Sequence, residues 1–291
     1  MIIFGYNLLF QDEPIFQDSV PANGLETIQV IEYPDFALEQ IFKLKSAWFE
    51  MTERDVRYLS HKPFNEAGKT FSWALEIKDI VTLVWESEKK EILYKKGKYY
   101  TPALLHFWIL HTFLPLVFEL ERIYRILHVG AVEVAGNVIL FSAFSFGGKS
   151  TLTDYFIKKG HTMLSDDTLG IVREKDGYKT IASYPFHRPY RKAEELGYPV
   201  KNFRLESKSL HSIYLLEKDD PAAKVGIEEI KGIEKFKVFY STSFVNFDFM
   251  KRERFEFFSA MSKHISVYRV TVPWDMERLN EVYHAIIKNV K

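Results

Sequence analysis

The sequence predicts an α/β protein with two domains, a smaller β-rich domain over residues 1–100 and an α/β domain over residues 101–291. Apolar and polar residues alternate between Phe71 and Tyr94, as they do in half-buried strands. A strand, a glycine-rich turn, a helix and a second strand then follow one another across residues 138–165. The chain has 291 residues, which is more than the ~100–200 typical of one domain.

The first 100 residues are expected to form a sheet. Met1–Phe10 is apolar but lacks the basic segment and the cleavage site of a signal peptide, so we expect a first strand there. Thr27–Tyr33 is a second candidate strand, and the remaining ones follow from alternating apolar positions: Phe71, Trp73, Leu75 and Ile77; Val81, Leu83 and Trp85; Ile92 and Tyr94. Such an aromatic sheet either grips a peptide or is an ordinary packed face, and we favour the packed face.

The apolar run Thr101–Leu120 approaches the ~20 residues that a membrane-spanning helix needs. It contains His106, His111 and Pro115, and charged residues follow at once. We therefore expect a buried helix of the second domain. No acidic or third histidine partner accompanies the two histidines, so we interpret them as core or interface residues rather than metal ligands.

The segment Val138–Leu152 indicates a phosphate-binding loop. A buried strand runs into a glycine turn, and a helix begins with Gly147-Gly148-Lys149-Ser150-Thr151. Backbone N–H groups at such a turn bind phosphate oxygens, a lysine neutralises the β- and γ-phosphates, and the next hydroxyl can bind Mg²⁺. The alternative is a chance Gly-Lys-Ser at a strand–helix junction. The predicted nucleotide-binding residues are Ala143, Phe144, Ser145, Phe146, Gly147, Gly148, Lys149, Ser150 and Thr151.

The segments before and after this loop argue against a chance match. Ala131–Ala135 and Val138–Ser142 flank Gly136-Asn137, a hairpin signal. After the loop, Thr151–Lys159 has helical spacing, and Thr162–Ser165 is a short strand that ends in Asp166 and Asp167. A parallel β–α–β crossover brings the carboxyl ends of both strands to one edge of a sheet. Lys149, Ser150, Asp166 and Asp167 are therefore expected around the same phosphates.

The order of these motifs resembles the HPr serine kinase/phosphorylase family. The matching features are His128-x-Gly130, a hairpin, the phosphate loop, a helix ending in Lys-Gly-His, and a strand ending in Asp166-Asp167. The chain is still more similar to the wider group of HPr-kinase-related proteins, which includes lasso-peptide kinases. The resemblance covers about residues 120–185 and implies the phosphoenolpyruvate-carboxykinase-like P-loop fold.

The resemblance also implies roles for individual residues. Asp167 matches the family's base on an acceptor hydroxyl, and His128 resembles its active-site histidine, although a core histidine is the alternative. Lys149 is expected to hold phosphates, Ser150 to bind Mg²⁺, and Asp166 to hold the metal or its water. The chain departs from the family at Ala143 and Phe146, where the family loop usually has glycine. It also lacks the family's glutamate motif with its following Arg-Gly-x-Gly, so the kinase-like assignment is stronger than the HPr-specific one.

Further along the chain, Leu169–Arg173 and Tyr178–Ala182 flank Asp176-Gly177, a second hairpin signal. The segment 183–197 is expected to be an irregular loop whose basic residues either touch phosphates or substrate or are solvated: His187, Arg188, Arg191 and Lys192. The charge run 251–254 is expected mostly at the surface. A capped amphipathic helix is expected from Asp275 to the end of the chain.

The amino-acid composition limits the classes of binding partner that we expect. Net charge is zero, so nothing indicates a nucleic-acid or anionic-membrane surface. The absence of cysteine excludes disulfides and cysteine metal sites. We expect a cytoplasmic protein with ATP and Mg²⁺ as cofactors and no nucleic-acid or membrane partner, and we leave a homo-oligomer open.

Three functions are compatible with the sequence. The first is an ATP-dependent kinase, a transferase that acts on a serine-type hydroxyl of a peptide, a protein or a small metabolite. The second is a nucleotide-binding regulatory protein whose altered loop has lost catalysis. The third, a carboxykinase-like decarboxylating enzyme, is the weakest, because the chain is short for it and no second metal-binding histidine and lysine set is evident.

Overall fold

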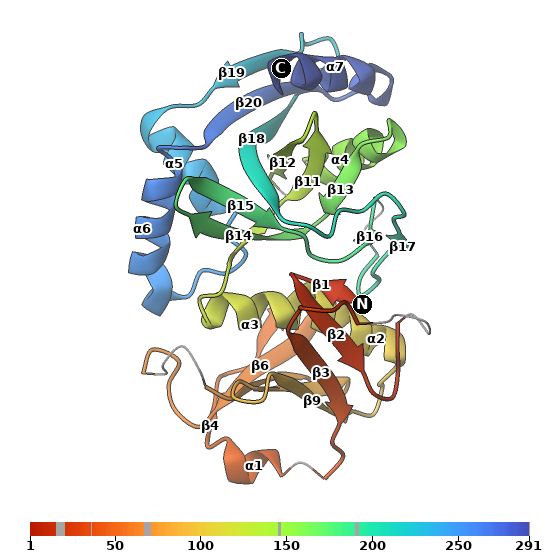
Figure 1. Ribbon diagram of the computed structural model, residues 1–291, viewed down its shortest axis with the longest axis vertical. Helices are drawn as coiled ribbons and strands as arrows, with labels where there is room; N and C mark the ends of the chain where they lie inside the picture. The colour runs from red at the N-terminus through yellow and green to blue at the C-terminus, as the bar shows by residue number, and fades with distance from the viewer. Residues whose placement is uncertain (16–20, 36, 67–70, 145–146, 190–191, 291) are drawn as a thin grey trace. The chain divides into compact units, whose positions relative to one another are not determined.

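The computed structural model describes residues 1–15, 21–35, 37–66, 71–144, 147–189 and 192–290. It is a mixed α/β protein with several sheets (Figure 1). The chain forms two compact units. The first contains Met1–Ile123 and Arg191–Leu196, and the second contains Tyr124–Tyr190 and Gly197–Lys291.

The first unit is built on a nine-stranded sheet with the order β1-β2-β3-β9-β8-β7-β6-β4, and β5 pairs with β6. β2 and β9 are both parallel to β3, and the other pairs are antiparallel. Its strands are β1 Ile2–Ile3, β2 Tyr6–Phe10, β3 Thr27–Glu32, β4 Leu44–Lys45, β5 Phe49–Met51, β6 Arg54–Ser60, β7 Trp73–Ile77, β8 Val81–Glu86 and β9 Glu91–Lys96, and a short helix α1 spans Leu38–Ile41. The alternating positions between Phe71 and Tyr94 thus lie mainly on three neighbouring strands, as expected.

A helical run crosses this unit after the last strand. It comprises α2 (Pro102–Phe107), a π-helical segment (Trp108–Phe113) and α3 (Leu114–Leu120). Every residue of α3 is buried. By length and composition Pro102–Leu120 could cross a membrane, but 78% of its apolar window is buried within the protein.

The helical run belongs to the first unit, whereas the sequence placed it in the second domain. The aromatic face of the sheet explains the difference. The ring centroids of Phe113 and Trp73 lie 4.9 Å apart, and those of Phe118 and Phe4 lie 5.2 Å apart. An apolar helix and an apolar sheet face that bury each other form one core, so the change from strand to helix pattern near residue 100 does not separate two compact units.

The two histidines of the run have partners within this unit. His106 Nε2 lies 2.8 Å from the carbonyl oxygen of Glu13, and burial lowers the pKa of His106. His111 stacks on Phe107 with ring centroids 4.7 Å apart. Among the described residues, no group of three or more His, Asp or Glu side chains could by itself hold a metal ion.

The second unit contains another mixed sheet, which also has nine strands, and a separate two-stranded sheet. Its strands are β10 Arg125–His128, β11 Gly130–Val134, β12 Asn137–Ala143, β13 Thr162–Ser165, β14 Thr168–Glu174, β15 Gly177–Ile181, β16 Phe186–His187, β17 Tyr198–Pro199, β18 Lys208–Asp219, β19 Gly226–Glu229 and β20 Ser266–Pro273. Its helices are α4 Lys149–Lys158, α5 Gly232–Ser241, α6 Lys251–Met261 and α7 Leu279–Val290. The long strand β18 pairs with β12 and β20 in parallel and with β15 antiparallel, which joins the two halves of the sheet.

The crossover through α4 joins two parallel strands, as expected, but these strands are not neighbours in the sheet. β13 does not pair with β12; both are antiparallel to β11, which lies between them. Two strands that are antiparallel to the same neighbour are parallel to each other. The carboxyl ends of β12 and β13 therefore still lie at one edge of the sheet.

Two hairpin turns lie one residue earlier than the sequence indicated. In the first, Asn137 is paired with Val134, and the turn residues are Ala135 and Gly136, both with positive φ (49° and 82°). This is the primed turn that matches strand twist, and it needs positive φ at both central positions. In the second hairpin Gly177 is already paired with Glu174.

Helices α5 and α6 lie side by side in the second unit (Figure 1). The sequence assigned the charge run 251–254 mostly to the surface, and Arg254 is the exception, at 1% exposed. Its guanidinium donates to the Val245 carbonyl at 2.7 Å and to the Tyr240 hydroxyl at 3.0 Å. A buried cation with these acceptors fixes the loop between the two helices.

Candidate active site

The predicted phosphate loop connects β12 to α4. Its strand ends at Ala143, and Gly147 N–H donates to the carbonyl of Phe144 at 2.8 Å. Gly148 precedes the helix with φ +87°. Lys149, Ser150 and Thr151 form the first turn of α4, whose first N–H groups have no acceptor within a helix. Ser145 and Phe146, both predicted to bind nucleotide, lie outside the described residues.

The two glycines of the loop are needed for different reasons. A Cβ atom at Gly147 would lie 2.5 Å from Ala143 Cβ and 2.7 Å from the Phe144 carbonyl oxygen, so no side chain fits there. Gly148 has the left-handed backbone that side chains disfavour. Ala143, which stands where the motif has glycine, thus takes up the space over Gly147.

Lys149 brings the predicted catalytic residues together. Its Nζ lies 3.0 Å from His128 Nε2 and 3.0 Å from Asp167 Oδ1. His128 Nδ1 lies 3.3 Å from the same Asp167 oxygen. Lys149 and Asp167 side chains are each 6% exposed, whereas His128 is 38% exposed. A buried lysine and carboxylate therefore face a histidine that solvent can reach.

Backbone pairing holds His128 in this position. His128 N–H donates to the Thr242 carbonyl at 2.6 Å, at the end of α5, and the next residue, Val129, donates to the Asp167 carbonyl at 3.1 Å. Gly130 then passes close to α4, where an added Cβ would lie 2.2 Å from Thr153 Oγ1. Glycine in the His-x-Gly sequence thus lets the strand approach the phosphate-loop helix.

Asp167 also accepts from a second cation, Arg188. Arg188 Nη2 donates to Asp167 Oδ2 at 3.0 Å. Both carboxylate oxygens are therefore engaged, Oδ1 by Lys149 and Oδ2 by Arg188. The hydroxyl of Ser165 orients the backbone here, because it donates to the Thr168 carbonyl at 2.6 Å and accepts from Asp167 N–H at 3.2 Å.

The segment that contains Arg188 also contacts Asp166. Its Oδ2 accepts from the backbone N–H of Arg188 at 2.8 Å and lies 3.1 Å from His187 Nδ1. The His187 contact is short, but the ring N–H is not aligned for a hydrogen bond. Burial raises the pKa of Asp166, whereas His187 and the Arg188 N–H lower it. The lowering effects are larger together, so the pKa of Asp166 lies below its usual value.

His187 connects Asp166 to the phosphate-loop helix. Its side chain is fully buried, and its Nε2 lies 3.5 Å from Asp154 Oδ1. Asp154 lies on α4, where it also accepts from the Tyr198 hydroxyl at 2.8 Å. The carboxylate at the end of β13 and the helix that carries Lys149 are thus linked through one imidazole.

Asp166, which is predicted to hold Mg²⁺, has an oxygen that fits such an ion. Asp166 Oδ1 is buried and has no hydrogen-bond partner among the described residues. A bare carboxylate oxygen is costly to bury, and a cation or its water would satisfy it. Mg²⁺ usually takes one or two protein ligands with phosphate oxygens and water, so Asp166 and Ser150 suffice without a larger cluster of protein ligands.

Arg188 and His187 are the site residues that sequence reasoning left open. They lie in the segment 183–197, where a phosphate-contacting role and a solvated loop were equally acceptable. The short strand β16, paired with β17, holds His187, and Arg188 follows it directly; both contact the aspartate pair. The available signal was the local density of basic residues, which does not say which one turns inward.

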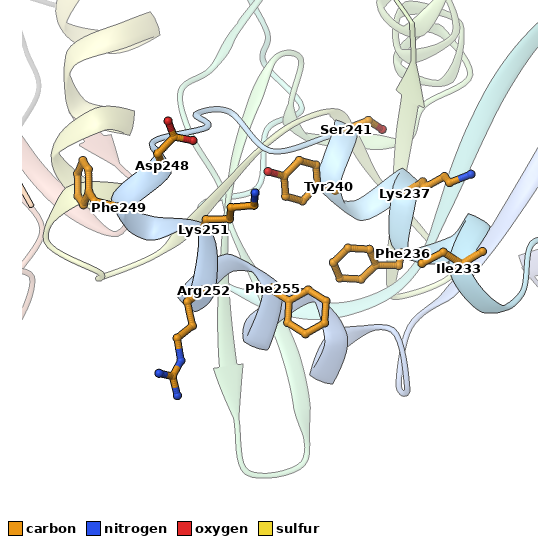
Figure 2. Close-up of a pocket in the computed structure, with 10 residues that line it drawn as sticks. All are labelled: Ile233, Phe236, Lys237, Tyr240, Ser241, Asp248, Phe249, Lys251, Arg252 and Phe255. Atoms are coloured by element: carbon orange, nitrogen blue, oxygen red, sulfur yellow. The ribbon is translucent and has the colours of Figure 1, made fainter.

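A large surface groove of the second unit lies elsewhere. It has a volume of about 880 Å³ and is lined by residues of α5, α6 and the loop between them. Figure 2 shows Phe236 and Phe255 on its walls, with ring centroids 5.2 Å apart. It contains none of the predicted site residues.

Comparisons with known proteins agree only with the coarse fold. No family model matches the chain, and no curated protein matches it. Among solved structures, the chain is similar to the HPr(Ser) kinase/phosphatase from Coxiella burnetii, at 12% identity and a TM-score of 0.34, over 57% of this chain and 95% of that one. The similarity is weak and concerns the fold alone, so a function has to be inferred from the site.

Proposed function

We propose that this protein is an ATP-dependent phosphotransferase acting on a serine-type hydroxyl of a peptide, a protein or a small metabolite. Its second unit would be a phosphoenolpyruvate-carboxykinase-like P-loop domain. One observation carries the proposal: Lys149 Nζ lies 3.0 Å from both His128 Nε2 and Asp167 Oδ1 at the end of a glycine turn. In this proposal Lys149 is the phosphate-binding cation, and Asp167 beside it is the proton acceptor.

Phosphate binding begins with the loop. The N–H groups of residues 147–151 and the positive end of α4 stabilise phosphate oxygens. The Lys149 ammonium, paired with Asp167 in the free protein, turns toward the β- and γ-phosphates. Asp167 then loses one of its neutralising cations, and its Oδ1 becomes available to accept a proton.

Transfer then follows from these positions. The acceptor oxygen forms a bond to the γ-phosphorus, the bond from that phosphorus to the bridging oxygen of ADP breaks, and the hydroxyl proton passes to Asp167. Arg188 Nη2, 3.0 Å from Asp167 Oδ2, adds positive charge where the transferred group is negative. His128, exposed and 3.3 Å from Asp167, orients that carboxylate toward the acceptor.

Asp166 and Ser150 hold the magnesium ion in this proposal. When bound, Mg²⁺ neutralises charge on the β- and γ-phosphates. The contacts of Asp166 Oδ2 with Arg188 N–H and His187 fix the carboxylate and leave Oδ1 for the metal or its water.

One observation supports a second candidate, a nucleotide-binding regulatory protein. Ala143 Cβ occupies space above Gly147 in which the motif has no side chain. If this methyl keeps phosphates out of the productive position, the loop would bind a nucleotide without transferring its phosphate. The ion-paired Lys149 and Asp167 would then have a structural role.

Two measurements separate these candidates. Calorimetry with ATP, with and without Mg²⁺, tests the phosphate loop, and wild type should bind more tightly with the ion. Transfer of label from γ-labelled ATP to peptides and proteins encoded beside the gene tests catalysis. Binding with no transfer to any of them favours the regulatory protein; no binding at all overturns both candidates.

A further inference from the structure

A small apolar pocket lies directly beside the phosphate loop. Its volume is about 170 Å³. Gly148 and Thr151 form its wall on the loop side, and Leu216, Trp274 and Leu279 form much of the rest. A pocket for a whole drug-sized ligand has roughly 300–1,000 Å³. This one therefore suits one part of a ligand whose remainder lies outside it.

The position of the pocket relative to Lys149 indicates which end of a bound ligand lies in the pocket. The Lys149 ammonium contacts His128 and Asp167, which mark the end where phosphoryl transfer takes place. The pocket is lined instead by Gly148 and Thr151, on either side of Lys149 in the chain. A phosphate chain bound along this turn thus has its reacting end at Asp167, and its other end is free to reach the pocket.

Trp274 is the residue of the pocket best suited to bind a flat ring. It is about half exposed (51%). Its backbone N–H donates to the Asp219 carbonyl at 3.1 Å, and the Lys218 ammonium lies 3.8 Å from the centre of its ring. The cation covers one face of the indole and holds it in place.

The side chains that line the pocket do not suit a phosphate group. Its side chains are mainly aliphatic, and its carboxylate, Asp275, already accepts from Glu277 N–H at 2.9 Å as a helix cap. A neutral aromatic ring matches these walls, because stacking on an indole and apolar burial both favour it. The exposed Met276 at the rim adds polarisable apolar surface.

We propose that this pocket is the nucleobase subsite, with Trp274 as the stacking residue. The proposal rests on the proposed function, since it assumes that the phosphate loop binds a nucleoside triphosphate. A purine should bind better than a pyrimidine, because its wider ring buries more area against the indole.

The test compares a ligand that has a base with one that lacks it. Calorimetry is run with Mg-ATP, Mg-CTP and Mg-tripolyphosphate on wild type, Trp274→Ala, Trp274→Phe and Lys149→Ala. Trp48→Ala is the matched control. Trp48 is also an exposed tryptophan (39%) under a cation, with Arg57 at 4.3 Å from its ring centre, and it lies in the first unit. Thermal melting of each variant shows whether it folds.

Trp274→Ala should weaken Mg-ATP binding at least about fivefold, since stacking on an aromatic side chain contributes that much per base. The same variant should bind Mg-tripolyphosphate as wild type does, and Trp274→Phe should recover most of the ATP affinity. Trp48→Ala should change nothing, and wild type should prefer ATP to CTP.

The subsite and the proposed function fail in different ways. If Trp274→Ala binds Mg-ATP as tightly as wild type while Lys149→Ala does not, the base lies elsewhere and the phosphate loop stands. If Trp274→Ala weakens tripolyphosphate as much as ATP, Trp274 supports the loop and does not stack on a base. If wild type binds neither ligand, the proposed function itself is wrong.

Discussion

Lys149 and Asp167 form a buried ion pair: Nζ and Oδ1 are 3.0 Å apart, and each side chain is only 6% exposed. Burying two charges is costly unless each has further partners, and both do, through His128 and Arg188. The pair also joins the two halves of the candidate site, because one residue begins α4 and the other follows β13. Any ligand that attracts Lys149 must therefore disturb Asp167.

Lys149→Met tests this coupling. We expect the variant to lose measurable Mg-ATP binding in calorimetry, since the ammonium is the point charge for the phosphates. Its unfolding free energy, from urea denaturation, should fall by less than the ~3–5 kcal/mol typical of a broken buried pair, because Arg188 still neutralises Asp167. Lys158→Met, on the exposed side of the same helix, should bind ATP normally. Unchanged ATP affinity in Lys149→Met would contradict the phosphate-loop interpretation.

Arg188 should matter for transfer and less for binding. Its side chain contacts Asp167, while its backbone N–H, which the alanine and lysine variants keep, contacts Asp166. Arg188→Ala should therefore lower the transfer rate while the Mg²⁺ dependence of ATP binding persists. Arg188→Lys should recover only part of the rate, because lysine lacks the planar fork of donors. Steady-state kinetics of both variants would show this, and a wild-type rate in Arg188→Ala would remove Arg188 from the site.

Gly130 and Thr153 are predicted to be coupled. Gly130→Ala places a methyl 2.2 Å from Thr153 Oγ1 and should destabilise the protein by about 1–3 kcal/mol. Thr153→Ala removes that oxygen, so the double variant should recover part of the loss despite losing the Thr153–Lys149 hydrogen bond. Gly226→Ala is the control, with its nearest contact at 3.6 Å. Purely additive effects in urea denaturation would show that the strand and helix do not meet as described.

Asp166 should contribute stability that acid removes. Its folded pKa lies below the usual 3.8 because burial, which raises it, is outweighed by His187 and the Arg188 N–H. A depressed carboxyl pKa contributes stability that is fully present above the unfolded pKa and is lost as pH falls through the folded pKa. The difference in urea midpoint between wild type and Asp166→Asn should therefore shrink below about pH 4. A difference that stays constant down to pH 2 would contradict this.

Local patterns predicted much of the second unit. The strand Thr162–Ser165 has the predicted bounds, α4 begins two residues before its predicted start, and the phosphate loop lies between β12 and α4. These elements follow from short-range rules, namely apolar periodicity, glycine turns and helix starts. The proximity of Lys149 to Asp167 was also expected, because the crossover fixes which strand ends share an edge.

Long-range packing was not predictable in the same way. The apolar run Pro102–Leu120 carries no signal for which sheet it will cover, and its aromatic partners in the first unit decided that. The intervening position of β11 between β12 and β13 depends on register across the sheet. Arg188 was ambiguous for a similar reason, since its inward orientation depends on the pairing of β16 with β17.

The most direct test of the central claim is phosphoryl transfer by Asp167→Asn with a serine-containing acceptor from the gene's neighbourhood. Asparagine keeps the shape of Asp167 but accepts no proton. We predict that the variant still binds Mg-ATP and transfers label from γ-labelled ATP ~10²–10⁴-fold more slowly than wild type. Transfer by Asp167→Asn at the wild-type rate would contradict the claim that this carboxylate takes the acceptor's proton.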